Sequence, residues 1–214
     1  MKLITLPCGP IMANCYFIIA SDSGNCIIVD PGDADDVLHV LEENKLHPKL
    51  VLLTHGHFDH CMGAAEIHKK TGAEIYLQAE DGEMIGGDNV YISAMQNSLE
   101  PFPFSPLPED GFALSVGDIS LKVLHTPGHS KGSVCFIDEA DSCIFSGDTL
   151  FFESIGRTDL HGGSMRALAD SVLKKLFSLP NSYIVYPGHG AATTIAHEKE
   201  FNPLARFSSH PWFN

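Results

Sequence analysis

Short runs of apolar and β-branched residues recur along the chain, separated by glycine, proline and polar residues. Runs of this length predict strands that are buried on both faces of a sheet. The predicted strands are 3–6, 16–19, 26–29, 50–53 and 75–77 in the first half, and 119–124, 133–137, 143–145 and 183–186 in the second. The run at 26–29 stops at Asp30-Pro31-Gly32, a sequence typical of a turn.

Apolar residues spaced three or four apart predict the helices. In the stretch 33–46, Val37 and Leu41 lie on one apolar stripe, and Asp33 stands near its start. Further helices are predicted over 61–71 and 165–177 and near 194–200. Each half therefore combines strands with helices. Two sheets packed face to face with helices outside make an α/β fold, a four-layer αββα sandwich.

The segment 79–108 follows neither pattern, because glycine and proline interrupt it repeatedly. A long irregular segment inside a compact domain is usually functional or mobile. Its apolar residues form either a lip over a site or a packed flap; they are Met84, Met95, Phe102 and Phe104.

The composition is that of one globular domain over residues 1–214, with 44% apolar and 19% charged residues. No apolar run approaches the roughly 18 residues that cross a bilayer. Residues 1–7 lack the apolar stretch of a secretory signal, so the sequence predicts a cytoplasmic protein.

Acidic residues outnumber basic ones, 27 against 13, and give a formal net charge of −14. Such a surface repels phosphate, which disfavours a nucleic-acid partner, a nuclease function and a membrane contact. The six cysteines include no C-x-x-C pair and are interpreted as small buried residues. As an alternative for Cys61, a thiol that opens a helix can be acidified.

Histidine and aspartate residues gather where four predicted strands end, with glycine close to each group. The candidate metal ligands are His55, His57, Asp59 and His60 after 50–53, His129 after 119–124, Asp148 after 143–145 and His189 after 183–186. Open sheets place ligand sites beyond the carboxyl ends of their strands. Imidazole nitrogens and carboxylate oxygens suit a borderline cation such as Zn²⁺.

The spacing within residues 55–60 indicates how these side chains would share ions. In an extended loop alternate side chains point the same way, so His55 and His57 can chelate one ion. Asp59 and His60 fall where the chain turns into the next helix and can reach a second ion. A solvated polar loop is the alternative, but three further groups of the same kind favour a metal site.

The motifs resemble those of the metallo-β-lactamase superfamily, most of all its glyoxalase II (hydroxyacylglutathione hydrolase) branch and the short bacterial relatives of that branch. The matching segments are Thr54-His55-Gly56-His57-Phe58-Asp59-His60, Thr126-Pro127-Gly128-His129, Gly147-Asp148-Thr149 and Pro187-Gly188-His189. The resemblance implies an αββα sandwich with a dinuclear site at one edge of the two sheets. It assigns to a first metal His55, His57 and His129, to a second Asp59, His60 and His189, and to a bridge Asp148.

This resemblance implies a metal-dependent hydrolase whose partner is a small-molecule thioester or ester. Two divalent ions and two aspartates leave a net charge of about +1 even with a bound hydroxide. A metal-bridging hydroxide would attack the carbonyl carbon, and Asp59 or Asp148 would act as the catalytic residue that moves the proton to the leaving group. Zn is the expected metal, with Fe or Mn as alternatives, since His/Asp sites accept all three. The oligomeric state stays open.

Two departures from the family pattern limit which substrates the resemblance implies. The best-known zinc β-lactamases carry cysteine at the position of Asp148, which argues against that activity. Full-length hydroxyacylglutathione hydrolases add a C-terminal helical region that holds glutathione, whereas residues 190–214 are all that follow His189 here. The acyl group and the thiol therefore stay open.

Other functions fit parts of the sequence. The segment Gly156-Arg157-Thr158-Asp159 also resembles the persulfide dioxygenases, which use one iron at the first site, and these are the main alternative. A flavodiiron enzyme would need a flavodoxin partner. A serine hydrolase is suggested by G-x-S-x-G at residues 128–132, but that motif needs a helix where 133–137 predicts a strand.

Lys131 and Arg157 are candidate substrate contacts, because each lies near a ligand loop and can neutralise a carboxylate. The alternatives are a solvated Lys131 and a buried pair of Arg157 with Asp159 or another acid that orients the metal loop. The remaining candidates are interpreted as supports of the site (His125 and Thr126), a rim residue (His161) and surface residues (His39, His47, His68, His197 and His210).

Overall fold

The structure is a computed structural model that describes residues 2–21, 23–85, 99–108 and 110–207. Its first sheet has the strand order β1-β2-β3-β4-β5-β6, with β1 Lys2–Cys8, β2 Ala13–Ile19, β3 Asn25–Val29, β4 His47–Leu52, β5 Glu74–Leu77 and β6 Ser105–Pro106. The second has the order β14-β13-β10-β9-β8-β7, with β7 Ala113–Val116, β8 Ile119–His125, β9 Val134–Asp138, β10 Cys143–Gly147, β13 Ile184–Pro187 and β14 Thr193–Thr194. The strands β11 (Leu150–Phe151) and β12 (Ser154–Ile155) form a separate hairpin.

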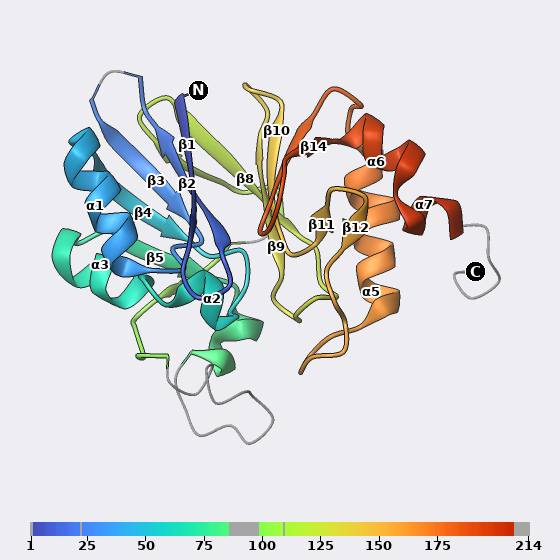
Figure 1. Cartoon of the computed structure of the whole chain (residues 1–214), viewed down its shortest axis with the longest axis horizontal. Coiled ribbons are helices and arrows are strands. Elements are labelled where there is room, and N and C mark those ends of the chain that lie inside the picture. The colour runs from blue at the N-terminus through green and yellow to red at the C-terminus, as the bar shows by residue number, and fades with distance from the viewer. Residues whose placement is uncertain (1, 22, 86–98, 109, 208–214) are drawn as a thin grey trace.

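Helices cover the outer face of each sheet (Figure 1). Over the first sheet lie α1 (Ala34–Asn44) and α3 (Ala64–Thr71), and over the second lie α5 (Met165–Asp170) and α6 (Ile195–Phe201). The predicted αββα sandwich is thus confirmed. Among the helices of the described ranges, none combines the length and apolar character that a bilayer crossing requires.

Alternating residues of the central strands fill different layers of the core. In β2, Phe17 packs under α1 and α3, whereas its neighbour Ile18 packs between the two sheets. In β10, Phe145 faces the space between the sheets and Ile144 packs under α5. Because both faces of these strands are buried, their sequences are continuously apolar rather than alternating.

The helix predicted over 61–71 is two helices in the structure. A short α2 (Phe58–Cys61) begins three residues earlier, and α3 starts after Gly63. A Cβ at Gly63 would lie 2.9 Å from the Pro31 carbonyl oxygen, so the chain approaches the 30–33 turn there more closely than another residue allows. The early start of α2 places Asp59 and His60 on a helical turn.

The helix predicted over 165–177 is continuous in the structure but changes its hydrogen-bond pattern. It runs from α5 through a π-helical turn, η2 (Ser171–Lys175), into a 3₁₀ turn, η3 (Leu176–Ser178). The chain then reaches α6 and α7 (Pro203–Phe207). The sequence patterns did not predict the strands β6, β7, β11, β12 and β14, each of four residues or fewer.

The segment 79–108 begins with a 3₁₀ helix, η1 (Ala79–Met84), and ends near β6. Met84 and Phe102 are buried, and Phe104 packs against the core under α1 and α3. These three side chains therefore form part of a packed flap and not a lip over the site. Met95 lies outside the described residues.

All six cysteines are free and buried, which confirms their interpretation as small core residues. Cys61 ends α2 instead of opening a helix. Burial raises the pKa of its thiol well above the usual value, so the alternative of an acidified thiol is wrong.

Candidate metal centre

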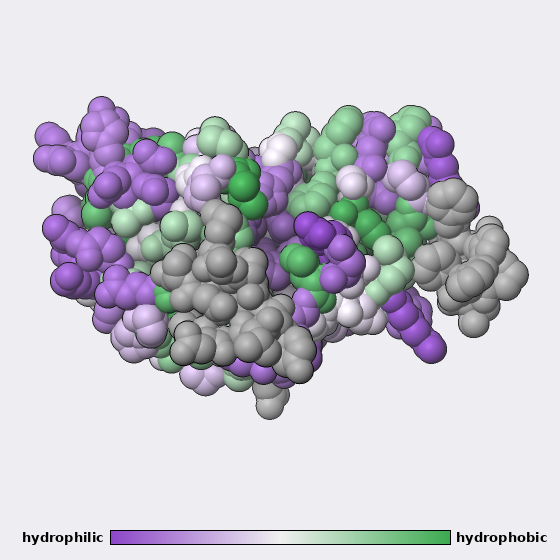
Figure 2. All heavy atoms as spheres, turned by 60° about the horizontal axis from the view of Figure 1, so that its bottom comes forward, coloured by the Kyte–Doolittle hydropathy of each residue, from purple (hydrophilic) through white to green (hydrophobic). Residues whose placement is uncertain are grey.

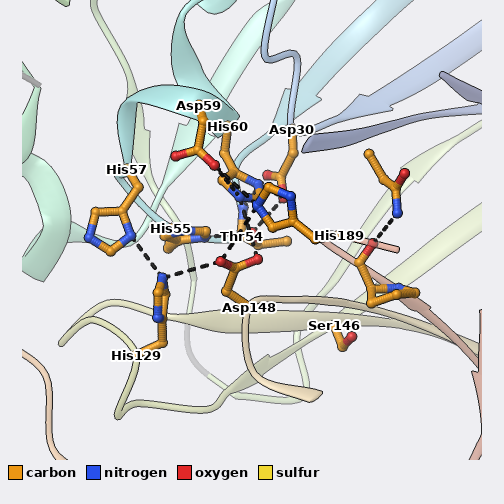
Figure 3. Close-up of polar contacts among 12 residues, drawn as sticks. Asp30, Thr54, His55, His57, Asp59, His60, His129, Ser146, Asp148 and His189 are labelled. Carbon is orange, nitrogen blue, oxygen red and sulfur yellow. Dashed lines mark hydrogen bonds and ion pairs between the residues drawn. The ribbon is translucent and has the colours of Figure 1, made fainter. Parts of the chain in front are cut away.

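The loops that follow β4, β8, β10 and β13 meet at one edge of the two sheets (Figure 3). The structure brings together all seven predicted residues there: His55, His57, Asp59, His60, His129, Asp148 and His189. The residues of 55–60 come from the first sheet and the other three from the second. The site therefore exists only when the two sheets are packed together.

His55, His57 and His129 form the first cluster. One ring nitrogen of each lies within 4.8 Å of those of the other two. The closest pair is His57 Nδ1 and His129 Nε2, which are 2.8 Å apart. Three imidazoles at this separation match the nitrogen-rich half of the predicted site.

Asp59, His60 and His189 form the second cluster, again with ligand atoms within 4.8 Å of one another. Asp59 Oδ2 lies 3.2 Å from His60 Nε2 and 3.2 Å from His189 Nε2. Asp59 and His60 are adjacent on the helical turn of α2, so the local backbone already brings them together. His189 reaches them from the loop after β13.

Asp148 lies between the two clusters. Its Oδ2 is 3.5 Å from His129 Nε2 in the first cluster, and its Oδ1 is 3.4 Å from His60 Nε2 in the second. A Cβ at Gly188 would lie 2.2 Å from Asp148 Oδ1, so only glycine lets the 187–189 loop come this close. This placement agrees with the bridge that the family resemblance implies.

Hydrogen bonds to Nδ1 orient three of the imidazoles. His60 Nδ1 donates to Asp30 Oδ2 at 2.9 Å, and His129 Nδ1 donates to the Arg157 carbonyl oxygen at 2.8 Å. The Thr54 hydroxyl gives its own proton to Asp30, so it accepts from His55 Nδ1, 3.0 Å away. In each ring Nε2 is left to face the cluster, as a metal ligand requires.

Asp30 is a residue of the site that the sequence analysis treated only as part of a turn. It has a positive φ of 53°. Its carboxylate accepts from the Thr54 amide at 2.7 Å, from the Thr54 hydroxyl at 2.6 Å and from His60. Although Asp30 also lies close to His55 and His60, its oxygens are engaged in these bonds, so it supports the imidazoles. The sequence feature that could have identified Asp30 as a site residue is the Asp-Pro-Gly turn directly after an apolar strand.

Three buried polar atoms of the described residues lack a hydrogen-bond partner: His55 Nε2, His60 Nε2 and Asp148 Oδ1. An unsatisfied buried polar atom costs about 1–3 kcal/mol. The three belong to the first cluster, the second cluster and the residue between them. A pair of cations would satisfy them together, so the donor set fits a dinuclear metal site.

The protonation of the histidines differs between the clusters. Burial, with the neighbouring His129, lowers the pKa of His57 to about 3, and burial also lowers that of His55. A hydrogen bond with Asp59 raises the pKa of His189. Burial opposes protonation of His60, but the charges of Asp148 and Asp30 outweigh it and raise its pKa. The pKa values of His60 and His189 in the second cluster are therefore raised, whereas those of His55 and His57 in the first are lowered.

The two predicted substrate contacts are both paired with acids. Arg157 forms the predicted pair with Asp159, with Nε and Nη2 at 2.7 and 2.8 Å from its oxygens. The pair is exposed, however, so the expectation of burial is wrong. It is the Arg157 backbone carbonyl that orients His129. Lys131 is exposed, and its Nζ lies 3.4 Å from Glu83 Oε1, which also contacts His161.

Neighbouring polar residues contact loops rather than the clusters. His125 Nε2 lies 2.9 Å from the Lys131 carbonyl oxygen, and Thr126 Oγ1 lies 3.0 Å from Thr149 Oγ1. After Ser130 the chain continues into β9, as predicted, so no nucleophile elbow forms. Ser130 Oγ donates instead to Asp81, a buried acid that the sequence analysis did not single out.

The family model of the Metallo-beta-lactamase superfamily matches residues 8–189, and the chain belongs to this superfamily. It is 39% identical to the uncharacterized protein ML0493 of Mycobacterium leprae, over 95% of this chain and 98% of that protein. It is 37% identical to the probable metallo-hydrolase YqgX of Bacillus subtilis (95% and 97%) and 32% identical to the hydroxyacylglutathione hydrolase GloC of Haemophilus influenzae (98% and 100%).

Solved structures share the fold over nearly the whole chain. BLEG-1, described as a B3 metallo-beta-lactamase, has a TM-score of 0.88 at 35% identity and covers 95% of this chain and 99% of its own. TTHA1623 in a di-iron-bound form has a TM-score of 0.82 at 36% identity (94% and 98%). ETHE1 from Myxococcus xanthus has a TM-score of 0.77 at 27% identity (96% and 85%). Members of this superfamily are metal-binding hydrolases, commonly with two divalent ions.

We expect acidification to release a cation from the second cluster before the first. A proton competes with a metal ion for the same imidazole nitrogen. Because the pKa of His60 and His189 is raised, protonation begins to displace metal there at a higher pH than in the first cluster, where the pKa of His57 is about 3. Co²⁺ titrations between about pH 8 and 5, repeated on His57→Ala and His189→Ala, test this order. Simultaneous release from both clusters would contradict it.

Replacing Asp30 by Asn should weaken metal binding about 10- to 100-fold, the usual effect of removing such a support. The amide nitrogen would face either the Thr54 N–H or the His60 Nδ1–H, so one donor loses its acceptor. Asp33→Asn is the matched control, because Asn also caps a helix and Asp33 caps α1 through the Asp36 amide. Equal metal affinity of the two variants in calorimetry would refute the support by Asp30.

Proposed function

We propose that the chain is a dinuclear metal-dependent hydrolase that cleaves a thioester or a related ester. The observation that carries the proposal is the convergence of seven histidine and aspartate side chains in two clusters, with three of their buried atoms left without partners. The superfamily assignment supports hydrolysis in general. The thioester substrate is suggested by the hydroxyacylglutathione hydrolase GloC, which is similar over the full length of both chains.

The residues of the two clusters would hold one ion each. His55, His57 and His129 would bind the first, Asp59, His60 and His189 the second, and Asp148 would bind both. We propose Zn, with Fe or Mn as alternatives, since the His/Asp donor set accepts all three. Bound there, two divalent ions lower the pKa of water towards neutrality and polarise a carbonyl oxygen.

Asp59 and Asp148 are the proposed catalytic residues. Burial raises the pKa of Asp59, but the hydrogen bond with His189 and the nearby His60 imidazole outweigh this and lower it well below the usual range. Asp59 is therefore ionised at neutral pH. Both carboxylates lie beside His60, and in the proposed reaction either would take a proton from the attacking water and pass it to the leaving group.

The hairpin β11–β12 brings an aromatic side chain next to the second cluster, where it would contact the uncharged part of a substrate. The hairpin β11–β12 follows Asp148 directly, and the Phe151 ring lies 6.2 Å from the His189 ring. Phe152 is 47% exposed and stacks on His197. Figure 2 shows a mainly hydrophilic surface over the half with α1 and α3, whereas apolar side chains gather over the other half.

The persulfide dioxygenase is the second candidate, favoured by residues 156–159 and by the structural similarity to ETHE1. That reaction uses the first site alone. The second cluster is complete in this chain, and Asp148 lies between the two, which supports two ions rather than one. A β-lactam is a third substrate to test, because BLEG-1 is described as a B3 metallo-beta-lactamase.

Protein purified without added metal should contain about two divalent ions per chain and hydrolyse a thioester such as S-lactoylglutathione. Chelation should abolish turnover, and Asp148→Ala should lower it at least about 100-fold, because both ions lose a ligand. His39→Ala, on the exposed face of α1, is the matched control and should leave turnover unchanged.

Other outcomes of the same measurement would separate the alternatives. One iron per chain, with oxygen consumption on glutathione persulfide and no thioester cleavage, would establish the dioxygenase. Cephalosporin cleavage faster than thioester cleavage would show a β-lactamase. Full turnover after chelation or in Asp148→Ala would exclude metal-dependent hydrolysis.

Lys131 and Arg157 remain proposed contacts for a substrate carboxylate, in competition with Glu83 and Asp159. Replacing either by Ala should raise KM for S-lactoylglutathione by about two- to fivefold, the range of an exposed ion pair, with kcat unchanged. A neutral thioester of N-acetylcysteamine should show no change. An equal rise in KM for both substrates would mean that these residues do not recognise a carboxylate.

A further inference from the structure

Asp81 is a buried carboxylate that lies outside the seven-residue cluster, on η1. It is 1% exposed and accepts three hydrogen bonds. Its Oδ2 accepts from the Gly56 amide at 3.0 Å and from the Ser130 hydroxyl at 2.6 Å. Its Oδ1 accepts from the Gly132 amide at 2.7 Å. Both carboxylate oxygens are thus engaged.

The three donors belong to the two loops that carry the first cluster. Gly56 stands between His55 and His57 in the loop after β4 of the first sheet. Ser130 directly follows His129 in the loop between β8 and β9 of the second sheet. One carboxylate therefore ties together two loops from different sheets, at the positions next to the three imidazoles.

The approach of both loops to Asp81 depends on glycine. A Cβ at Gly132 would lie 2.8 Å from Asp81 Cγ, and one at Gly56 would lie 3.1 Å from Asp81 Cβ. Real Cβ contacts of this length force the neighbour to move. The glycines thus allow each backbone N–H to point directly at the carboxylate. Ser133 Oγ, 2.7 Å from Ser130 Oγ, completes the network.

We propose that Asp81 is a positioning residue for the first cluster, holding the loop of His55 and His57 against the loop of His129 so that the three imidazoles can share one divalent cation. It binds neither the cation nor the substrate. The inference rests on the proposed metal site but not on the proposed thioester substrate. The second cluster obtains Asp59 and His60 from α2 and His189 from a loop that Asp81 does not touch, so it should be independent of this residue.

An Asn at position 81 cannot make the same network. If its NH₂ group replaces Oδ1, it faces the Gly132 N–H, and if it replaces Oδ2, it faces the Gly56 N–H. One backbone donor is then opposed by another donor, and one loop is released. The isosteric variant Asp81→Asn therefore removes the hydrogen bond with little change in volume.

The test is Co²⁺ titration of the metal-free protein in two backgrounds. His189→Ala leaves the first cluster intact, and His57→Ala leaves the second intact. Asp81→Asn should weaken Co²⁺ binding about 10- to 100-fold in the His189→Ala background and by less than about twofold in the His57→Ala background. No loss in the first background, or an equal loss in both, would overturn the proposal.

Asp138→Asn is the matched control in both backgrounds. Asp138 is also buried, but one oxygen accepts both the Ala140 and Asp141 amides, so an Asn oxygen can replace it. It should leave Co²⁺ affinity unchanged. If Asp81→Asn fails to fold by circular dichroism, Gly132→Ala takes its place, since its Cβ pushes against the Asp81 carboxylate. Gly132→Ala should show the same selective loss, and unchanged affinity would overturn the proposal.

Thioester turnover separates this proposal from the proposed function. Suppose that Asp81→Asn selectively loses the first ion but the unaltered protein cleaves no thioester. The positioning role of Asp81 would then stand, and the proposed thioester substrate would be wrong. Suppose instead that Asp81→Asn binds Co²⁺ as well as the unaltered protein does and that the unaltered protein cleaves thioesters. The thioester substrate would then stand, and the positioning role of Asp81 would be wrong.

Discussion

Polar and charged side chains are buried between the ends of the two sheets, and the hydrogen bonds among them leave some of their atoms without a partner. His55 Nε2, His60 Nε2 and Asp148 Oδ1 are buried without a partner, while Asp59 and Asp148 bring negative charge to the same place. Removing such groups from water is costly unless an opposite charge or a hydrogen bond compensates. Divalent cations bound there would provide this compensation.

Three of the imidazoles are oriented by groups that are not themselves candidate metal ligands. Asp30, Thr54 and the Arg157 carbonyl each engage the Nδ1 of a different histidine and leave its Nε2 for the cluster. Asp81 acts on the same loops through their backbone amides. These supports come from the turn after β3, from the loop after β4, from the segment after β12 and from η1. The ligand geometry therefore depends on packing across the whole edge of the sandwich.

The surroundings of the two clusters are unequal, and this bears on the substrate. The second cluster adjoins the aromatic β11–β12 hairpin, and its histidines have raised pKa values. The cations Lys131 and Arg157 lie on loops next to His129, each already paired with an exposed acid. An anionic group of a substrate would have to replace Glu83 or Asp159, whereas an apolar group next to the second cluster would lie near Phe151.

The sequence by itself determined the sandwich and the seven candidate ligands. Continuous apolar runs are enough to predict strands buried on both faces, and the spacing of residues 55–60 is a local property that the loop after β4 preserves. Only the tertiary structure decided that Asp30 and Asp81 support the site and that Arg157 pairs on the surface and acts through its carbonyl. It also decided the short strands β6, β7, β11, β12 and β14. The physical reason is that a local pattern reports burial and chain direction, whereas the partner of a carboxylate or of a two-residue strand comes from a distant segment and is fixed only when the sheets pack.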